Sequence, residues 1–497
     1  MNARTRDERF CLARCTNCGQ RIEFPREGLG RAVACPACAQ ETVLEQAEAE
    51  AVPVAELVED ISAAELEEAF QGTVTRRRIS VFYQLGLLLV TVFMLFLPVA
   101  YLALTAALAW GVYWYAVHGL ALFTSMAGGL YGIIIRAALY VAPNVAGIVA
   151  VFFMFKPLLA KNAKRVEPLE LNPSNHPRVY QFIAHISDIL RIPMPSRIEV
   201  TAELNASAGF RKGFLSFLGR DLALSIGLPM VAGLNTRQLA AVMAHELGHC
   251  TQGLAMRLYY IIARINLWFA RVIYQRDTWD ESLEEWAAEV ESSLGTFIVW
   301  CAQMAVAMSR GLLRLLMFLG DAAMCFLSRE MEYHADACAI GVAGSAAVEG
   351  LQLRLRELKI FDVYAYQGLT HFWQQRRQLP DSLTEFMDQL EQRAPADFRE
   401  KTAETILNES AGFFATHPTP AQRIRKARQL GEPGVFTLEK PARLLFRNFE
   451  DVSRIVTLQH FRRFLRLAVM PAMLKPAKEF FREPPAAGAT ANEEQQQ

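Results

Sequence analysis

Two histidines and a glutamate stand together in the stretch Ala241–His249, whose last five residues read His-Glu-Leu-Gly-His. His245 and His249 are four residues apart, so on a helix both imidazoles lie on one face, where a single Zn²⁺ can bind both. Glu246 lies beside that face and could move a proton from a water on the metal to a leaving amine. The alternative is a surface helix with two solvated histidines. We favour the metal site because two of only nine histidines fall at this spacing on an apolar helix that Asn235 can cap.

A catalytic zinc needs a third protein ligand and leaves one coordination position open. Downstream, Glu332 and Asp336 are again four residues apart, so both carboxylates face one way on a helix. Glu332 is the candidate third ligand, and Asp336 can accept the remaining N–H of a ligand histidine and fix its tautomer. The alternative is an acidic pair on a solvated helix face. The residues that flank Glu332 and Asp336 argue against this alternative.

Those flanking residues resemble the M48 family of zinc metallopeptidases, a gluzincin family that includes the CAAX prenyl proteases. The family pattern is HExxH followed by a helix reading S-R-x-x-E-[FY]-x-A-D, which the chain matches from Ser328 to Asp336. A late Thr-His-Pro segment with a downstream Arg-Ile is matched by Thr416–Pro418 and Arg423–Ile424. The resemblance, which covers about residues 167–430, implies that His417 and Arg423 stabilise the oxyanion of the substrate.

The family also has an N-A-x-A-x-G edge strand before the zinc helix. Here it is matched by Asn205, Ala206, Ser207 and Ala208, with the glycine one place early at Gly209. A strand beside the zinc helix offers an edge to which an extended peptide can add, so the resemblance implies substrate binding at these residues. An ordinary core strand is the alternative, and both descriptions can hold.

Cysteines are concentrated at the N-terminus, where five of the nine fall within the first 38 residues. Cys15-x₂-Cys18 and Cys35-x₂-Cys38 are separated by 16 residues, the spacing of a structural zinc site with four thiolate ligands. We therefore predict a zinc ribbon, with two redox-active dithiols as the alternative, and expect Cys11 to be a free thiol. Thiolate zinc sites are typical of reducing compartments, which predicts a cytoplasmic N-terminus. The binding partner of the ribbon is unknown.

The stretch from Val81 to Leu159 is apolar and carries only two charged residues, Arg136 and Lys156. It is long enough for two or three membrane spans, which we place near 81–110 and 138–159. Basic residues flank both outer ends, at 76–78 and at 161–165. The positive-inside rule then puts both ends in the cytoplasm and favours two spans over three. We expect a multi-pass membrane protein, of the bacterial inner membrane, whose catalytic domain faces the cytoplasm.

The hydrophobic segment 250–327 separates His249 from Glu332. Arg257, Arg264 and Arg271 are spaced by seven, so one helical stripe of this segment is basic, which fits a helix at a membrane surface. Because His249 and Glu332 must meet at one metal, the segment must cross the bilayer zero or two times. We favour zero crossings, with a hairpin of two spans as the alternative.

Together these features predict a mainly α membrane protein with an α+β zincin-type catalytic domain and a small edge sheet, plus a small β zinc ribbon. The expected order is a zinc ribbon (1–44), an acidic linker with a short helix (45–80), a transmembrane region (81–160), the metallopeptidase domain (161–435), a C-terminal helical extension (436–482) and a disordered tail (483–497). The net charge of zero gives no global field that would attract nucleic acid, and we expect none as a partner.

The predicted function is that of a membrane-anchored zinc endopeptidase that hydrolyses membrane-associated or misfolded proteins at the cytoplasmic face. One catalytic Zn²⁺ and one structural Zn²⁺ are the expected cofactors, and polypeptides and the lipid bilayer are the expected partners. Two other functions stay open: a membrane-tethered zinc-binding scaffold without turnover, and a processing protease with a narrow substrate range. The intact Glu246 argues against the first, and the small number of spans argues against a multi-span chamber for the second.

Overall fold

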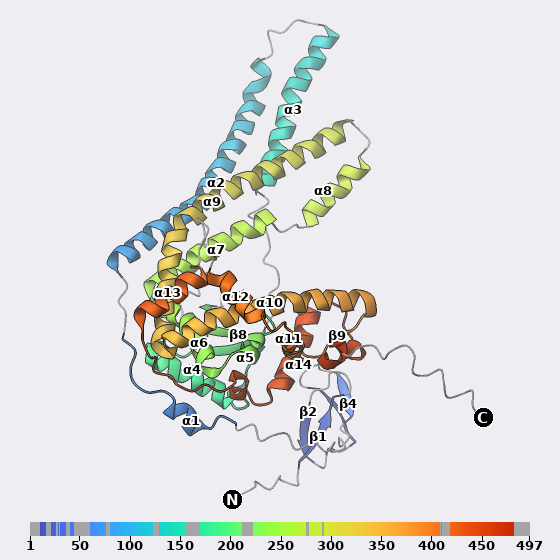
Figure 1. The fold of residues 1–497 in the computed structure, drawn as a ribbon. Coiled ribbons are helices and arrows are strands. Elements are labelled where there is room, and N and C mark those ends of the chain that lie inside the picture. Colours follow the sequence, from blue (N-terminus) through green and yellow to red (C-terminus); the bar gives the residue numbers. More distant parts are fainter. Residues whose placement is uncertain are drawn as a thin grey trace, which may run out of the picture.

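The computed structural model describes residues 10–15, 21–25, 28, 30–35, 40–43, 60–75, 80–122, 129–155, 168–210, 222–274, 278–290, 293–407, 409 and 418–481. Within these ranges the chain is rich in helices and has a few small sheets (Figure 1). Four sets of residues singled out from the sequence lie outside them: Cys18 and Cys38, His417, the basic residues at 76–78 and 161–165, and the tail at 483–497.

Two β-hairpins form the described part of the N-terminal region. Strand β1 (Phe10–Arg14) pairs antiparallel with β2 (Arg21–Pro25), and β3 (Ala32–Ala34) pairs antiparallel with β4 (Glu41–Val43). Cys15 directly follows β1, Cys35 directly follows β3, and both are buried. The two hairpins thus place one cysteine each where the predicted ribbon needs it. The zinc ribbon itself stays a prediction, because the two partner cysteines lie outside the described residues.

Residues 60–75, which we call the N-terminal strap, differ from the solvated spacer expected in this region. The predicted short helix is present as α1 (Ala63–Glu68), which Ser62 caps by accepting from the backbone N–H of Glu65. Leu66 is fully buried, and the ring of Phe70 lies 4.4 Å from that of Phe436 and stacks on His185 at 5.1 Å. The described part of this segment is therefore packed into the core of the globular domain.

A four-stranded sheet stands beside the zinc helix. Its order is β5 (Leu169–Glu170), β6 (Arg197–Thr201), β8 (Leu222–Gly227) and β7 (Ala206–Phe210). Strands β6 and β8 are parallel, whereas β7 runs antiparallel to β8 and forms the edge. Helix α4 (Pro177–Leu190) and the short α5 (Leu228–Gly233) frame helix α6 (Thr236–Cys250), which contacts β7. Asn235 caps α6 in a reciprocal capping box with Gln238, as expected.

Three helices follow α6, and the last of them returns to it. They are α7 (Leu254–Tyr274), α8 (Thr278–Glu289) and the long α9 (Ser293–Ala343). Helix α9 contains both the apolar segment Gly295–Cys325 and, two turns later, Glu332 and Asp336. One continuous helix thus joins a membrane-type segment to the candidate third zinc ligand (Figure 1).

The apolar region forms two long helices, α2 (Val81–Leu122) and α3 (Leu130–Phe155), which project together away from the globular part (Figure 1). Among the described residues three helices are long and apolar enough to cross a membrane: α2, α3 and the segment of α9. The two expected spans therefore correspond to α2 and α3, although α3 begins earlier than the predicted 138–159. The third candidate falls in the segment for which we expected no crossing.

The remaining chain completes the globular core. Its elements are α10 (Ser345–Arg376), β9 (Leu379–Pro380), α11 (Leu383–Gln392), α12 (Phe398–Leu407), α13 (Pro420–Leu430), α14 (Phe449–Gln459) and β10 (Leu474–Lys475). Phe436, Phe449 and Phe461 are buried in the same cluster as the residues of α6, and β10 pairs with β9. Residues 436–481, expected as an extension, therefore pack as part of the domain.

Candidate active site

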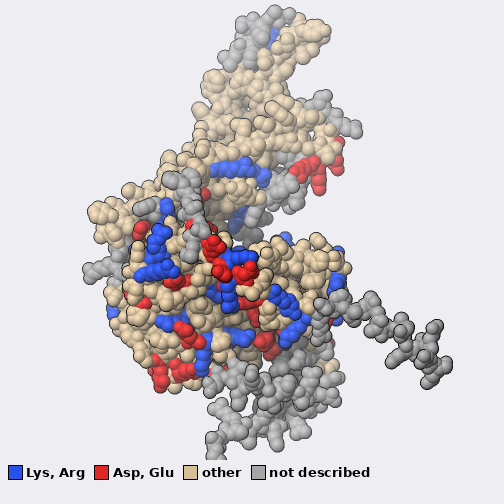
Figure 2. Space-filling view, viewed as in Figure 1, with Lys and Arg blue, Asp and Glu red and all other residues tan. Residues whose placement is uncertain are grey.

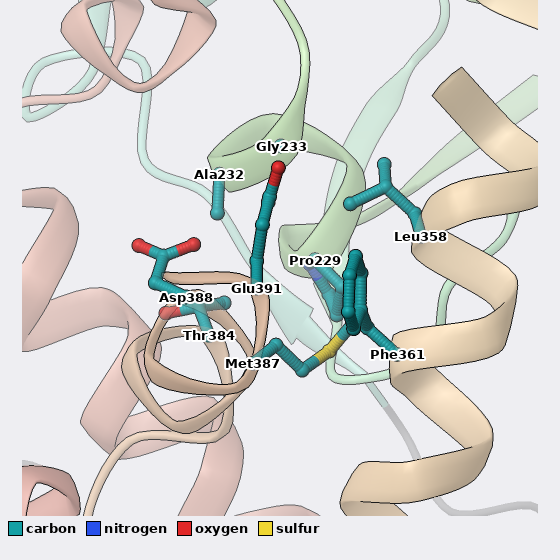
Figure 3. Close-up of a pocket in the computed structure, with 9 residues that line it drawn as sticks. All are labelled: Pro229, Ala232, Gly233, Leu358, Phe361, Thr384, Met387, Asp388 and Glu391. Carbon is teal, nitrogen blue, oxygen red and sulfur yellow. The ribbon is translucent and has the colours of Figure 1, made fainter. Parts of the chain in front are cut away.

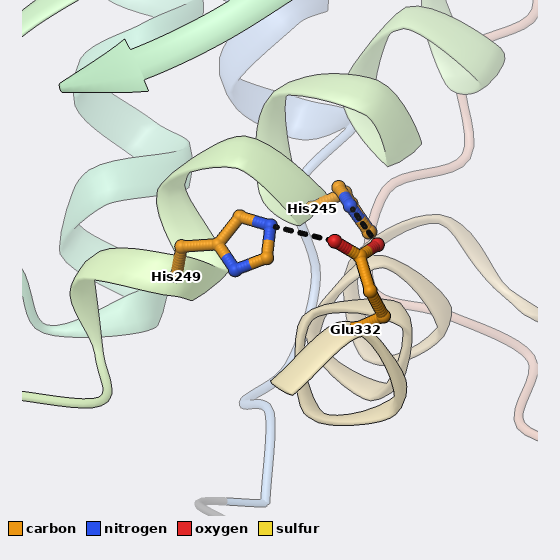
Figure 4. A group of neighbouring side chains, drawn as sticks. All are labelled: His245, His249 and Glu332. Carbon is orange, nitrogen blue, oxygen red and sulfur yellow. Dashed lines mark ion pairs between the residues drawn. The ribbon is translucent and has the colours of Figure 1, made fainter. Parts of the chain in front are cut away.

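Helices α6 and α9 bring His245, His249 and Glu332 together, as the sequence predicted (Figure 4). The Nε2 atom of His245 lies 3.3 Å from Oε2 of Glu332, and Nε2 of His249 lies 3.9 Å from Oε1 of the same carboxylate. All three candidate ligand atoms lie within 4.8 Å of one another. Two imidazole nitrogens and one carboxylate thus point at a common centre.

Gly248, inside the HELGH stretch, allows the two helices to approach. A Cβ atom at this position would lie 3.0 Å from the Cβ of Cys338 and 3.3 Å from the Cα of Ala335, both on α9. These distances are shorter than ordinary van der Waals contacts, so a larger residue would push α9 away from α6. The glycine therefore helps to set the distance between the histidines and Glu332.

A charged network supports His245 from the side opposite the common centre. Its Nδ1 atom lies 3.0 Å from Oδ1 of Asp336, as predicted for a carboxylate that fixes the histidine tautomer. Asp336 in turn accepts hydrogen bonds from Nε and Nη2 of Arg423, a residue of α13. Burial by itself would raise the pKa of Asp336, but Arg423 and His245 outweigh burial and hold that pKa below its usual range. Asp336 is therefore charged at neutral pH.

This arrangement fits a divalent cation. When His245 donates its Nδ1–H to Asp336, its Nε2 lone pair faces a carboxylate oxygen, and the two lone pairs repel unless a proton or a cation lies between them. Burial lowers the pKa of His245, but the hydrogen bonds to Asp336 and Glu332 outweigh burial and raise that pKa to about 9. Burial, and then the nearby His245, lower the pKa of His249 to about 4. A cation can replace the proton on His245, and a site of two histidines and one glutamate suits zinc.

Glu246 stands next to the three candidate ligands and faces the edge strand. Its carboxylate accepts a hydrogen bond from the backbone N–H of Ala208 in β7. Burial and the nearby Glu332 raise the pKa of Glu246, against the opposing effect of His245. A carboxylate with a raised pKa can hold a proton between the two halves of a hydrolysis, which is the role predicted for this residue.

These groups open into a cleft of about 440 Å³. One wall contains Asn205, Ala206 and Ala208, three of the four residues expected to bind substrate. Ser207 does not line the cleft, because neighbouring residues of a strand point to opposite sides. The opposite wall belongs to α7, for which the sequence analysis named no residue of the site. Its four contributing residues are Met256, Tyr259, Tyr260 and Ala263.

Tyr260 is held in place by a neighbour one turn along α7. The Nε and Nη2 atoms of Arg264 donate to its phenol oxygen at 2.9 and 2.6 Å, and the guanidinium lies 5.0 Å from the ring centroid. The only signal in the sequence was that α7 directly follows the zinc helix, which brings its first turns close to the histidines. The pattern of residue types in α7 does not reveal which side chains face the cleft.

The resemblance implied that His417 and Arg423 stabilise the oxyanion, and the structure describes only the second of them. Arg423 lines the cleft, but Nε and Nη2 of its guanidinium are bonded to Asp336. His417 lies outside the described residues, although Pro418 and the capping residue Thr419 directly precede α13. The structure thus places Arg423 where it can support Asp336.

A second, much smaller cavity of about 10 Å³ lies between α5, α10 and α11 (Figure 3). Its lining is mostly apolar and includes Pro229, Leu358 and Phe361, together with the carboxyls of Asp388 and Glu391. Burial, opposed by Arg443, raises the pKa of Asp388 to about 6. The cavity is too small for a substrate. The half-buried carboxyl of Asp388 beside it affects the stability of the fold.

Comparison with known proteins identifies sequence similarity to one group. The model of the family described as Peptidase family M48 matches residues 173–430. The chain is 27% identical over 282 residues to Protease HtpX of Acinetobacter baumannii (strain AYE), which covers 54% of this chain and 79% of that protein. It is 26% identical over 279 residues to Protease HtpX of Stutzerimonas stutzeri (strain A1501), covering 55% and 80%. No solved structure matches the chain significantly.

Proposed function

Since the chain belongs to peptidase family M48 and is a membrane metalloprotease, we propose that it is an endopeptidase whose catalytic zinc is held by His245, His249 and Glu332. The observation that carries this proposal is the convergence of two Nε2 atoms and one carboxylate beside Glu246, in a cleft that is also lined by residues of β7, the edge strand of the described sheet. Zinc bound there would polarise the substrate carbonyl and make a water more acidic.

The residues of the chain have distinct roles in this proposal. Glu246 accepts the proton of the attacking water and delivers it to the departing nitrogen, so a single carboxylate serves both halves of the reaction. Asp336 keeps the Nε2 atom of His245 available as a ligand by accepting a hydrogen bond from its Nδ1–H. Arg423 keeps Asp336 charged and in place, and His417 stays our candidate for stabilising the oxyanion.

We place substrate binding at β7, the edge strand of the described sheet. Asn205, Ala206 and Ala208 line the cleft, so an extended peptide can pair with this edge and bring one carbonyl to the metal. We propose that substrates are membrane-associated or misfolded proteins and that the cleft faces the cytoplasm. The charge pattern around the apolar helices supports the cytoplasmic placement, because basic residues flank the apolar segment 81–155 on both of its sides.

We further infer that Cys15, Cys18, Cys35 and Cys38 hold a second, structural zinc. The two hairpins support this inference, since each presents one buried cysteine directly after a strand. The ribbon would then occupy residues 1–44, ahead of the N-terminal strap. Because the strap and residues 436–481 pack into the catalytic core, we propose that the peptidase domain also contains residues 60–75 and extends to about 481.

A single carboxylate variant tests the mechanism. Glu246→Gln keeps the size of the side chain but cannot act as a base, so cleavage of an unfolded membrane protein by purified enzyme should fall roughly 10²–10⁴-fold. Zinc content, measured beside cleavage, should stay unchanged. Glu404→Gln, which changes an exposed glutamate on α12, is the matched control and should cleave normally. A Glu246→Gln protein with full zinc and normal cleavage would rule out the mechanism.

Topology reporters test the membrane placement. Fusions at residues 75 and 165 should both report the cytoplasm, and a fusion near Gly119 should report the opposite side. Different locations for the first two would mean an odd number of crossings between them. A wild-type protein that binds zinc fully and cleaves none of a panel of membrane and unfolded proteins would instead favour a zinc-binding scaffold.

A further inference from the structure

Helix α7 carries a row of arginines beside the cleft. Arg257, Arg264 and Arg271 are seven residues apart, so they lie on one face at intervals of about 10 Å along the axis. The opposite face of α7 is buried against α2 and α9 through residues such as Ile262 and Phe269. Helix α9 adds Arg310 and Arg314. We call these five residues the arginine band.

Next to Arg310 and Arg314, helix α9 exposes a stripe of large apolar side chains. The members, at helical spacing, are Trp300, Met304, Met308, Leu315 and Phe318. An apolar stripe flanked by arginines is typical of a helix that lies at a membrane surface, with its apolar face among the acyl chains and its cations among the headgroups. Helix α7 adds Trp268 and Tyr274, residue types that favour the same zone.

The arginine band lies at the base of the α2–α3 hairpin. The hydroxyl of Tyr101 in α2 donates to the carbonyl of Met154 in the last turn of α3, and its oxygen lies 2.7 Å from Oγ of Ser309, the neighbour of Arg310. From this level α2 continues to Leu122, a length of about 33 Å, which matches the hydrocarbon thickness of a bilayer. The base of the hairpin is therefore where a headgroup layer would lie.

The distribution of charge supports this level. Of the described residues in α2 and α3, only Arg136 is charged. Figure 2 shows an almost uncharged outer part of the projection, both lysine or arginine and acidic side chains at its base, and a globular part rich in both signs. Basic residues collect at the cytoplasmic border of membrane proteins, where anionic headgroups attract them.

Arginines in the middle of both helices indicate that the α7–α9 hairpin does not cross the bilayer. If only the apolar segment of α9 crossed, His249 and Glu332 would be on opposite sides, so a second crossing would be required. Helix α7, which precedes α9 and packs on it, would have to supply that crossing. Arg264 would then lie in the middle of one crossing, and Arg310 and Arg314 in the middle of the other. Burying these guanidinium groups in hydrocarbon would be very costly, so the hairpin lies along the surface.

Three cations of this surface are placed to bind phosphate groups. Within the described ranges Arg257 and Arg314 have no carboxylate partner, and Arg264 donates to the uncharged phenol of Tyr260. We propose that these three arginines of the band bind the headgroup phosphates of anionic phospholipids in the cytoplasmic leaflet and so hold the α7 wall of the cleft on the bilayer surface. This inference rests on the membrane placement proposed above, and it does not depend on turnover.

The consequence for the active site is geometric. Met256, Tyr259, Tyr260 and Ala263 form one wall of the cleft and belong to the same helix as three of the five arginines. A peptide bound between β7 and this wall lies directly under the headgroup layer. The enzyme would therefore reach segments of membrane proteins that leave the bilayer close to its surface.

Lipid retention measures the proposal directly. Full-length protein is reconstituted in nanodiscs with equal amounts of phosphatidylglycerol and phosphatidylcholine, and native mass spectrometry counts the lipids of each kind that stay bound. Each arginine near an anionic surface contributes about fivefold to partitioning. Wild-type protein should retain phosphatidylglycerol selectively, and the triple variant Arg257→Gln, Arg264→Gln, Arg314→Gln should lose most of that selectivity.

Two matched variants control for charge and for folding. The triple lysine variant at the same positions keeps the charge and should keep the selectivity. Glutamine at Arg376, Arg399 and Arg463, three exposed arginines of the globular domain, should also keep it. The measurement is repeated in a Glu246→Gln background, so that a failure of the proposed catalysis does not affect it.

Two outcomes would overturn the proposal. Equal retention of both lipids by the wild type would show that the band does not select anionic headgroups. A triple glutamine variant with unchanged lipid selectivity, but with impaired cleavage of an acidic soluble peptide in neutral nanodiscs, would show that the band binds acidic substrate segments instead. A reporter inserted at residue 290 adds a topological check, because it should report the cytoplasm if the hairpin does not cross.

Discussion

Replacing Arg423 by glutamine separates two possible roles of this residue. In the structure Nε and Nη2 of its guanidinium bond to Asp336, and Asp336 bonds to Nδ1 of His245. The family resemblance instead suggests that the guanidinium acts on the substrate oxyanion. The two roles predict different losses, because a supporting residue affects zinc binding and stability, whereas an oxyanion ligand affects only turnover.

The size of the expected loss follows from burial. The side chain of Asp336 is 1% exposed, so without Arg423 a carboxylate is left buried with only His245 as a partner. Breaking one side of a buried ion pair costs about 3–5 kcal/mol. Loss of a residue that orients a metal ligand typically lowers metal affinity about 10–100-fold. Since Arg423 holds the pKa of Asp336 low, the loss of stability should be largest at neutral pH and shrink as acid protonates Asp336.

The assay compares three properties of the wild-type and Arg423→Gln proteins in detergent. Zinc affinity is measured by competition with a chelator, stability by thermal unfolding, and cleavage with excess zinc present. We expect weaker zinc binding and a lower Tm, with cleavage largely restored when zinc is saturating. Asp336→Asn should give similar losses, and the double variant should lose less than the sum, because the two residues form one network.

One result would refute the supporting role. If Arg423→Gln binds zinc with wild-type affinity and unfolds at the wild-type temperature, yet cleaves more slowly at saturating zinc, the guanidinium acts on the reacting substrate. Arg423→Lys adds a further distinction. Lysine keeps the charge but cannot reproduce the two-nitrogen contact with Asp336, so it should restore part of the stability.

Three further predictions concern the metal, the small cavity and the strap. Each single loss of a catalytic zinc ligand should lower the bound zinc, measured by elemental analysis, from two ions per chain to about one; the variants are His245→Ala, His249→Ala and Glu332→Ala. If Glu332→Ala keeps both zinc ions, Glu330 becomes the next candidate ligand. The pKa of Asp388 is raised to about 6, so the folded state holds its proton more tightly and stability falls as pH rises from about 4 to about 6. Asp388→Asn should remove this effect and stabilise the protein above pH 6 by up to about 3 kcal/mol in thermal unfolding, whereas an unchanged pH profile would contradict it. Phe70→Ala should lower the free energy of unfolding by roughly 2–3 kcal/mol, less than the 3–5 kcal/mol typical of a fully buried phenylalanine. Glu68→Ala, which changes an exposed residue of the strap, is the control. Equal stability of the two variants would mean that the strap is not part of the core.

Lipid-facing and linker segments show where sequence patterns mislead. The strap was expected to be part of an acidic linker, yet five of its apolar side chains pack in or against the core: Ile61, Leu66, Ala69, Phe70 and Val74. Apolar length alone could not decide whether the segment Gly295–Cys325 crosses the bilayer. Its role depends on its packing against α7 and on the arginines that lie in the middle of both helices.

The sequence by itself determined the chemistry of the candidate site. Residues four apart on a helix share a face whatever the rest of the chain does. The sequence therefore indicated that His245 and His249 are a pair of ligands, and that Glu332 is a ligand on the same face as the supporting carboxylate Asp336. Only the tertiary structure decided how these two helices meet across the 82 residues between them, with Gly248 against Cys338 and Ala335. It also decided that Arg423 bonds to Asp336 and that α7 forms the second wall of the cleft. Such contacts join segments far apart in the chain, and they depend on the packing of whole helices, which no local spacing encodes.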